Sequence, residues 1–317
     1  MATSLARRGL LTLPALLLAG CNTVVMKPSG DIAAQQGHLI FVSTMLMLLI
    51  IVPVIVLTFW FAWRYRHSQT DTSVPYDPEW DHSTMLELVI WGAPLLIIIA
   101  LGLLTWITTH TLDPYRPLER IDAQHPVAAD VKPLTVEVVA LDWKWLFIYP
   151  DQGVATVNEL VAPANTPIRF KITASTVMNS FYIPALAGQI YAMPGMETQL
   201  NAVINKEGDY EGFSANYSGA GFSDMHFTFH GVSNEGFDKW VQETRAGGGA
   251  LDRPVYLDLE QPSINSPVRR FATVDRDLYH AILNRCVAAG SACMDQTMMT
   301  DVNVKPGRGT SSTEQAQ

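Results

Sequence analysis

This 317-residue sequence has few charged residues. Only 16% of its residues are charged and 48% are hydrophobic, whereas about 25% of a typical soluble domain is charged. The charges that are present give a net value of −9. Nucleic-acid binding needs a basic surface, so this composition excludes DNA- and RNA-binding classes. The apolar residues crowd into the first third of the chain, which indicates a membrane part.

Groups for catalysis or metal binding are also scarce. The sequence has three cysteines and eight histidines, and no nucleophile–base pair or multi-histidine cluster stands out. His226 and His230 share one face of an expected strand. Residues four apart on a strand are separated by about 13 Å, too far for one ion to bridge. We therefore interpret both histidines as solvent-facing polar residues.

The N-terminus has the pattern of an export signal. Arg7 and Arg8 precede a short apolar run that ends in Leu-Ala-Gly-Cys21. The run is too short to span a bilayer, and its basic start and small final residues are typical of a secretory signal peptide. The cysteine resembles the acylated cysteine of bacterial lipoproteins. The pattern thus predicts a signal peptide over residues 1–20 and a lipid anchor on Cys21; an ordinary signal peptide with an incidental cysteine is the alternative.

Two long uncharged runs follow and predict a transmembrane hairpin within residues 21–112. We expect helices over about 38–63 and 85–109, each long enough to cross a bilayer. Arg64 and Arg66 directly follow the first helix, and positive charge marks the cytoplasmic side. The chain after about residue 110 is then expected outside the cytoplasm.

Glu87 lies at the cytoplasmic start of the second expected helix. A carboxylate in a first helical turn suits the positive end of the helix dipole, which would give it an ordinary structural role. Ionisable groups at membrane depth also handle protons. The residues alone leave both interpretations open.

After residue 133 the pattern changes to short, partly alternating segments. Segments 134–150, 167–174, 197–204 and 225–232 are rich in β-branched and aromatic residues, and turns with glycine or proline separate them. In the last segment, Met225, Phe227 and Phe229 share one face. Several short strands with frequent turns predict an exported β-sandwich or β-barrel over residues 133–240. Together with the hairpin, this gives an α+β membrane protein.

The C-terminal part, residues 250–297, follows a glycine run at 247–249 that predicts a flexible joint. Residues 274–294 are helical in pattern over their first half. A disulfide between Cys286 and Cys293 suits an oxidising compartment, but it requires the helix to break near Gly290. A pair of buried thiols is the alternative to the disulfide, and a metal site on these two cysteines is a much weaker one. Residues 298–317 are rich in Ser, Thr, Gly and Gln and are predicted to be disordered.

This arrangement resembles subunit II of the haem–copper terminal oxidases, most closely the cytochrome bo-type ubiquinol oxidase branch. The resemblance covers roughly residues 15–295. It rests on the lipoprotein signal, the hairpin, the Asp-Trp-Lys-Trp motif at 142–145 and the segments 157–175, 177–196 and 211–227. It implies a cupredoxin-like fold for the exported domain and a small aromatic-rich C-terminal region.

In the cytochrome c oxidase branch this domain carries a dinuclear copper centre. Its ligands are two histidines, two cysteines, a glutamate carbonyl and a methionine. The same spacing falls on this sequence without a gap, at Asn179, Ser214, Asn216, Ser218, Phe222 and Met225. Serine, asparagine and phenylalanine cannot replace the thiolates and imidazoles that hold such a centre. The resemblance therefore implies no metal or other cofactor in this chain, and Met225 is interpreted as a packing residue.

The resemblance implies a structural and assembly subunit, without catalytic residues, of a proton-pumping ubiquinol oxidase in the bacterial inner membrane. Subunit I would carry the haems and one copper and oxidise ubiquinol, with further small membrane subunits as partners and no cytochrome c. Glu87 would lie at the mouth of a proton pathway into subunit I. Trp143 and Trp145 match an aromatic patch on the electron route of copper-bearing relatives; here packing or subunit contact is the favoured role, and electron transfer is the alternative. The alternatives are subunit II of a cytochrome c oxidase and a free-standing envelope lipoprotein.

Overall fold

The computed structural model describes residues 23–66, 79–128 and 131–297. The described chain divides into a helical unit, residues 23–28 and 32–116, and a β-rich unit, residues 117–297 with residues 29–31. The expected signal peptide, the acylation candidate Cys21 and the expected disordered tail lie outside the described residues.

The helical unit consists of two long helices after a short 3-10 turn, η1 (Val24–Met26). Helix α2 covers Asp31–Arg64 and helix α3 covers Thr84–Thr111, so both extend beyond the predicted spans. Their most apolar windows have mean hydropathies of 3.0 and 2.5, and no residue in either window is buried. At 1.5 Å per residue the helices measure about 50 and 42 Å. They are long and apolar enough to cross a membrane.

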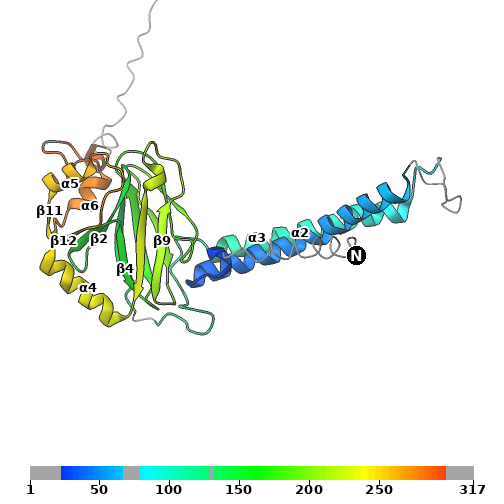
Figure 1. Cartoon of the computed structure of the whole chain (residues 1–317), viewed down its shortest axis with the longest axis horizontal. Coiled ribbons are helices and arrows are strands. Elements are labelled where there is room, and N and C mark those ends of the chain that lie inside the picture. The colour runs from blue at the N-terminus through cyan, green and yellow to red at the C-terminus, as the bar shows by residue number, and fades with distance from the viewer. Residues whose placement is uncertain (1–22, 67–78, 129–130, 298–317) are drawn as a thin grey trace, which may run out of the picture. The chain divides into compact units, whose positions relative to one another are not determined.

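Twelve strands of the described chain form two sheets (Figure 1). The seven-stranded sheet has the order β11-β12-β3-β2-β1-β5-β8, and the five-stranded sheet has the order β4-β10-β9-β6-β7. The strands are β1 (Leu134–Leu141), β2 (Lys144–Tyr149), β3 (Val154–Val157), β4 (Glu159–Pro163), β5 (Ile168–Ala174), β6 (Asn179–Tyr182), β7 (Ile190–Ala192), β8 (Thr198–Ala202), β9 (Gly208–Ser214), β10 (His226–Val232), β11 (Gly249–Leu251) and β12 (Arg269–Val274).

An aromatic core fills the space between the two sheets. Trp145 and Phe147 of β2 meet Phe181 of β6 and Phe227 of β10, with ring centroids 5.0 to 6.3 Å apart. These side chains are almost fully buried. Aromatic rings in edge-to-face contact give both burial and orientation, so this cluster fixes the two sheets against each other.

The other face of the seven-stranded sheet is covered as well. Leu146 and Ile148, which alternate with the aromatic residues of β2, belong to a second buried cluster with residues of the C-terminal part. That part contains α5 (Arg253–Glu260) and α6 (Leu278–Leu283), and a longer helix, α4 (Asn234–Gly247), precedes it. Figure 1 shows these three helices on the side of the sheets away from β9. The C-terminal part therefore shares both sheet and core with the preceding strands.

The structure corrects three sequence-based expectations. Segment 134–150 is not one strand but two antiparallel strands, β1 and β2, that turn at residues 142–143. Gly247 ends α4 and Gly249 begins β11, so the glycine run is built into the fold and is not a flexible joint. Helix α6 ends at Leu283 and Arg285 has a φ of 56°; the helix thus breaks before Cys286 and not near Gly290.

Helix α4 was missed, although its signal is present in the sequence. Ser233 caps the helix by accepting a hydrogen bond from the backbone nitrogen of Gly236 at 3.0 Å. The buried residues are Phe237, Trp240, Val241 and Thr244, at the spacing expected for an amphipathic helix.

Candidate functional site

The six residues at the copper-ligand positions lie at the start of β6, at the end of β9 and on the segment between β9 and β10. Asn179 begins β6 and Ser214 ends β9. The Ser214 hydroxyl donates to Oδ1 of Asn179 at 3.2 Å, and the backbone nitrogen of Ser214 donates to the carbonyl of Met225 at 3.2 Å. The fold thus brings together Asn179, Ser214 and Met225, which are up to 46 positions apart in the sequence.

Three of the four remaining positions, Asn216, Phe222 and Met225, also make contacts in this region. Asn216 donates through Nδ2 to the carbonyl of Met178 at 3.2 Å. Phe222 opens the short 3-10 turn η2 (Phe222–Asp224) and packs its ring edge-on against Tyr217. Met225 is fully buried. It therefore fits the packing role expected for it.

This donor set does not fit a dinuclear copper centre. Asn179 and Ser214 are at most 3% exposed and offer an amide and a hydroxyl, where copper requires thiolates and imidazoles. Ser218 places a buried hydroxyl here that has no hydrogen-bond partner in the described structure. Across the described ranges, no group of three or more His, Cys, Asp or Glu residues is arranged to hold a metal ion.

The Asp-Trp-Lys-Trp turn joins this loop to the C-terminal part. The Trp143 indole donates to the carbonyl of Ser218 at 3.0 Å, and its ring lies so close to Gly221 that a Cβ there would approach within 2.5 Å. Trp145 is buried in the aromatic core. Both tryptophans thus occupy packing positions.

Lys144 is a buried residue whose role sequence reasoning missed. Only 2% of it is exposed, and Nζ donates to the carbonyl of Gln261 at 2.8 Å and to the hydroxyl of Ser263 at 2.6 Å. Burial lowers the pKa of the ammonium group. Apart from its place within the aromatic motif, no sequence signal separates this lysine from a surface lysine.

Glu87 lies in the first turn of α3, as predicted. Its backbone nitrogen donates to the carbonyl of the cap residue Ser83 at 2.9 Å. Its carboxylate is 2.7 Å from Nδ1 of His82, a neighbour that the sequence did not indicate. Glu87 thus combines a helix-dipole position with a second titratable group beside it.

His226 and His230 are 47% and 32% exposed and lie on the outward face of β10. Each pairs with its own carboxylate of β9: Glu211 at 2.9 Å and Asp209 at 2.6 Å. Met225, Phe227 and Phe229 are buried on the opposite face. The predicted division of these residues is confirmed.

The remaining candidate pair, Cys286 and Cys293, lies just after α6. Their Cα atoms are 4.8 Å apart and their sulfur atoms are bonded. No copper-ligand position lies on this segment.

Comparison with known proteins places this fold in a class. Residues 150–232 match the family described as cytochrome c oxidase subunit II, periplasmic domain, and residues 245–290 match the cytochrome oxidase (COX) aromatic rich motif. The periplasmic domain of cytochrome oxidase subunit II from Bradyrhizobium japonicum is 26% identical. It covers 37% of this chain and 94% of its own, with a TM-score of 0.34. Two helices apolar enough to cross a membrane, followed by a cupredoxin-like domain that matches the subunit II family, define a membrane-anchored oxidase subunit II, and the predicted fold class is confirmed.

The relatives identify the branch. Cytochrome bo(3) ubiquinol oxidase subunit 2 of Pseudomonas putida is 50% identical over 270 residues, covering 85% of this chain and 82% of that protein. Ubiquinol oxidase subunit 2 of Acetobacter aceti is 48% identical over 299 residues, covering 92% and 94%. The chain belongs to the ubiquinol oxidase subunit 2 family, which confirms the resemblance.

Proposed function

We propose that this chain is the structural and assembly subunit of a proton-pumping ubiquinol oxidase that reduces oxygen to water in an aerobic respiratory chain. The observation that carries the proposal is the hydrogen-bonded Asn179–Ser214 pair at two positions where copper-bearing relatives have a histidine and a cysteine. Neutral amides and hydroxyls cannot hold a copper pair. The route from cytochrome c is closed in such a domain.

Electrons then enter at another subunit. Ubiquinol is oxidised at subunit I, which carries the haems and a single copper, and further small membrane subunits complete the assembly. The names of the relatives support ubiquinol as the substrate. This chain contributes the membrane hairpin and the cupredoxin-like domain, and none of its residues takes part in oxygen reduction.

The proposed location is the bacterial inner membrane. Arg64 ends α2 and Arg66 follows it, which supports a cytoplasmic position for the loop between the helices. The β-rich unit then lies in the periplasm, and Cys21 carries a lipid anchor at the mature N-terminus.

The complex purified through this chain tests the proposal. Oxygen consumption is measured with reduced ubiquinol and, separately, with reduced cytochrome c, together with copper per complex. We expect activity with ubiquinol alone and one copper. Activity with cytochrome c and two further coppers would instead indicate a cytochrome c oxidase subunit, and recovery without haem-bearing partners would indicate a free-standing lipoprotein.

We also propose that Glu87 lies at the mouth of a proton pathway into subunit I. Its support is its place in the first turn of a helix without other acidic residues, together with the His82 imidazole 2.7 Å away. Ionisable groups at membrane depth are costly and are kept for function.

A further inference from the structure

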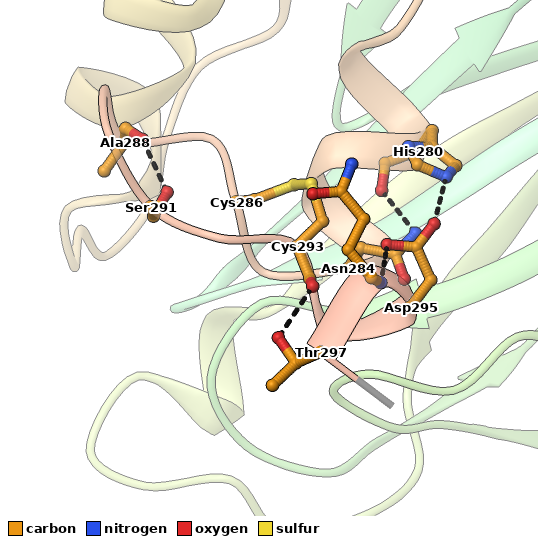
Figure 2. Close-up of a disulfide and its surroundings, with 9 residues drawn as sticks. His280, Asn284, Cys286, Ala288, Ser291, Cys293, Asp295 and Thr297 are labelled. Atoms are coloured by element: carbon orange, nitrogen blue, oxygen red, sulfur yellow. Dashed lines mark hydrogen bonds and ion pairs between the residues drawn. A yellow bond between two sulfur atoms is a disulfide. The ribbon is translucent and has the colours of Figure 1, made fainter. Parts of the chain in front are cut away.

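The segment after α6 folds back on itself into a hook, defined here as residues 284–297. Arg285 adopts a φ of 56°, and the backbone nitrogen of Cys286 donates to the carbonyl of Ala281 at 2.8 Å. The chain leaves the helix here, which brings Cys286 and Cys293 within the Cα distance that a disulfide requires. Figure 2 shows the sulfur bridge closing the hook.

The disulfide joins a buried residue to a more accessible one. Cys286 is 4% exposed and belongs, with its neighbour Val287, to the cluster on the outer face of the seven-stranded sheet. Cys293 is only partly buried and packs against the same cluster. Of the residues between them, Val287 is buried and residues 288–292 are exposed. The bridge therefore ties a solvent-facing loop directly to the core.

Beyond Cys293 the hook is held by individually weak contacts. Met294 donates from its backbone nitrogen to the carbonyl of Asn284 at 3.0 Å, and Asp295 lies 3.1 Å from Nε2 of His280 (Figure 2). The side chain of Met294 also lies against Gly195, where an added Cβ would come within 3.3 Å. Exposed ion pairs and single hydrogen bonds contribute little alone. Without covalent closure they would not keep the hook in place.

Helix α6, to which the hook is tied, packs beside a group of partly buried ionisable side chains. Tyr279 of α6 faces Glu197 and Glu137, and Lys171 approaches Glu197 at 4.0 Å. Burial raises the pKa of Glu137 to about 7. Loosening α6 would expose the buried Tyr279 side chain, and with it Glu137, more fully to water.

We propose that Cys286 and Cys293 form a redox-closed latch that holds the hook and α6 on the outer face of the seven-stranded sheet. The proposal rests on the proposed export of this unit. An exported protein disulfide accepts the electrons: one cysteine thiolate attacks it and forms a mixed disulfide. The other thiolate then displaces the exported protein's dithiol. Two protons and two electrons leave this chain, and the latch is closed.

Trypsin digestion of the complex, purified through this chain without reductant, tests the latch. Arg285 is an exposed cleavage site inside the hook. We expect slow cleavage of the peptide bond between Arg285 and Cys286. Cleavage should become at least about tenfold faster after phosphine reduction or in Cys293→Ser, because a hook without the bridge opens locally and exposes this bond to the protease. Cys293→Ser leaves Cys286 in the core, so it separates loss of the bridge from loss of packing.

Two controls complete the experiment. Ser291→Ala alters the same exposed loop but keeps both cysteines, and its cleavage should match that of the unsubstituted chain. Reduction should not accelerate cleavage of Cys293→Ser any further. Maleimide should label Cys286 and Cys293 only after reduction. Labelling of both thiols before reduction, or cleavage that reduction leaves unchanged, would overturn the latch. Ubiquinol oxidation is measured independently, so either proposal can fail alone.

Discussion

At the copper-ligand positions, main-chain bonding preserves the loops while the side chains differ. The bond from the Ser214 nitrogen to the Met225 carbonyl and the bond from the Met225 nitrogen to the Phe222 carbonyl involve no side chain. The Asn179–Ser214 contact gives each of these two buried side chains a polar partner. The frame of the site can therefore persist without metal, because its conformation depends on backbone bonds.

Glu87 provides the first prediction for a single residue. Glu87→Ala should slow proton uptake and ubiquinol-dependent oxygen consumption several-fold, because the group that receives the proton is removed. Glu87→Gln should do the same, since an amide does not titrate. Assembly should be unaffected, because the carboxylate is half exposed and its ion pair with His82 contributes little. Turnover and pumping are measured in reconstituted vesicles.

The matched control for Glu87 is Asp81→Asn, which removes an exposed carboxylate just before α3. Its turnover should equal that of the unsubstituted complex. Normal turnover and normal pumping in Glu87→Ala would contradict the role in proton entry.

Glu137 provides a prediction about pH. Burial is the largest cause of its raised pKa, Glu197 adds to the rise, and Lys171 opposes it; Tyr279 is the titratable group facing it from α6. The folded-state value of about 7 lies above the ordinary value of 4.5, so the neutral carboxyl stabilises the fold. Its contribution, about 3 kcal/mol, is fully present below pH 4.5 and is lost as the pH rises through 7.

Thermal unfolding of the complex between pH 5 and 8 tests this dependence. The midpoint should fall with rising pH, and Glu137→Gln should flatten that fall because its amide stays neutral. Glu207→Gln, at an exposed carboxylate, should retain the slope of the unsubstituted chain. Equal slopes in all three proteins would show that Glu137 is ionised throughout this range.

Among the elements, β2 shows where sequence patterns stop being informative. All six of its residues are buried, because Trp145 and Phe147 face one core and Leu146 and Ile148 face the other. A strand buried on both faces loses the polar alternation that marks strand boundaries. The sequence pattern therefore gives no sign of the turn at residues 142–143. By contrast, β10 has one solvent-exposed face, and the pattern predicts its bounds to within one residue.

The candidate site was more predictable than the strands around it. The ligand positions follow from spacing within the resemblance, and in the fold Asn179 and Ser214 share a hydrogen bond. Lys144 and Glu137 could not be found in this way. Their character comes from burial by residues more than a hundred positions later, such as Gln261 and Tyr279.

Neighbouring glycines test the structure of the run between α4 and β11. A Cβ on Gly248 would overlap the backbone nitrogen of Ala272, whereas a Cβ on Gly249 meets nothing within 4 Å. Gly248→Ala should therefore destabilise the protein by about 1–3 kcal/mol, and Gly249→Ala should change stability by less than about 0.5 kcal/mol. Thermal midpoints of the two variant complexes decide the matter: a flexible joint would tolerate both substitutions equally.

At the scale of the whole molecule, the C-terminal part is needed to complete the β-rich unit. Strand β12 pairs with β3 from Arg269 to Phe271. Arg270 and Glu159 form a two-pronged ion pair at 2.6 and 2.7 Å, to which Trp240 adds an indole contact at 3.4 Å. The C-terminal part also covers the buried cluster on the outer face of the seven-stranded sheet, called the outer cluster here, which includes Val139 of β1 and Leu146 and Ile148 of β2. The cupredoxin-like strands are thus stabilised by residues that lie after them in the chain.

Truncation after Gly247 should therefore prevent accumulation of the chain. It removes β11, α5, β12 and α6 and leaves Val139, Leu146 and Ile148 of the outer cluster exposed to water. A contiguous apolar patch of this kind favours aggregation and proteolysis. Truncation after Thr297 is the control: it removes only the tail predicted to be disordered and keeps every contact of the outer cluster. Immunoblots of membranes and ubiquinol oxidase activity give the readout. A chain ending at Gly247 that still accumulated and assembled an active oxidase would mean that the first ten strands hold their fold without the C-terminal cover.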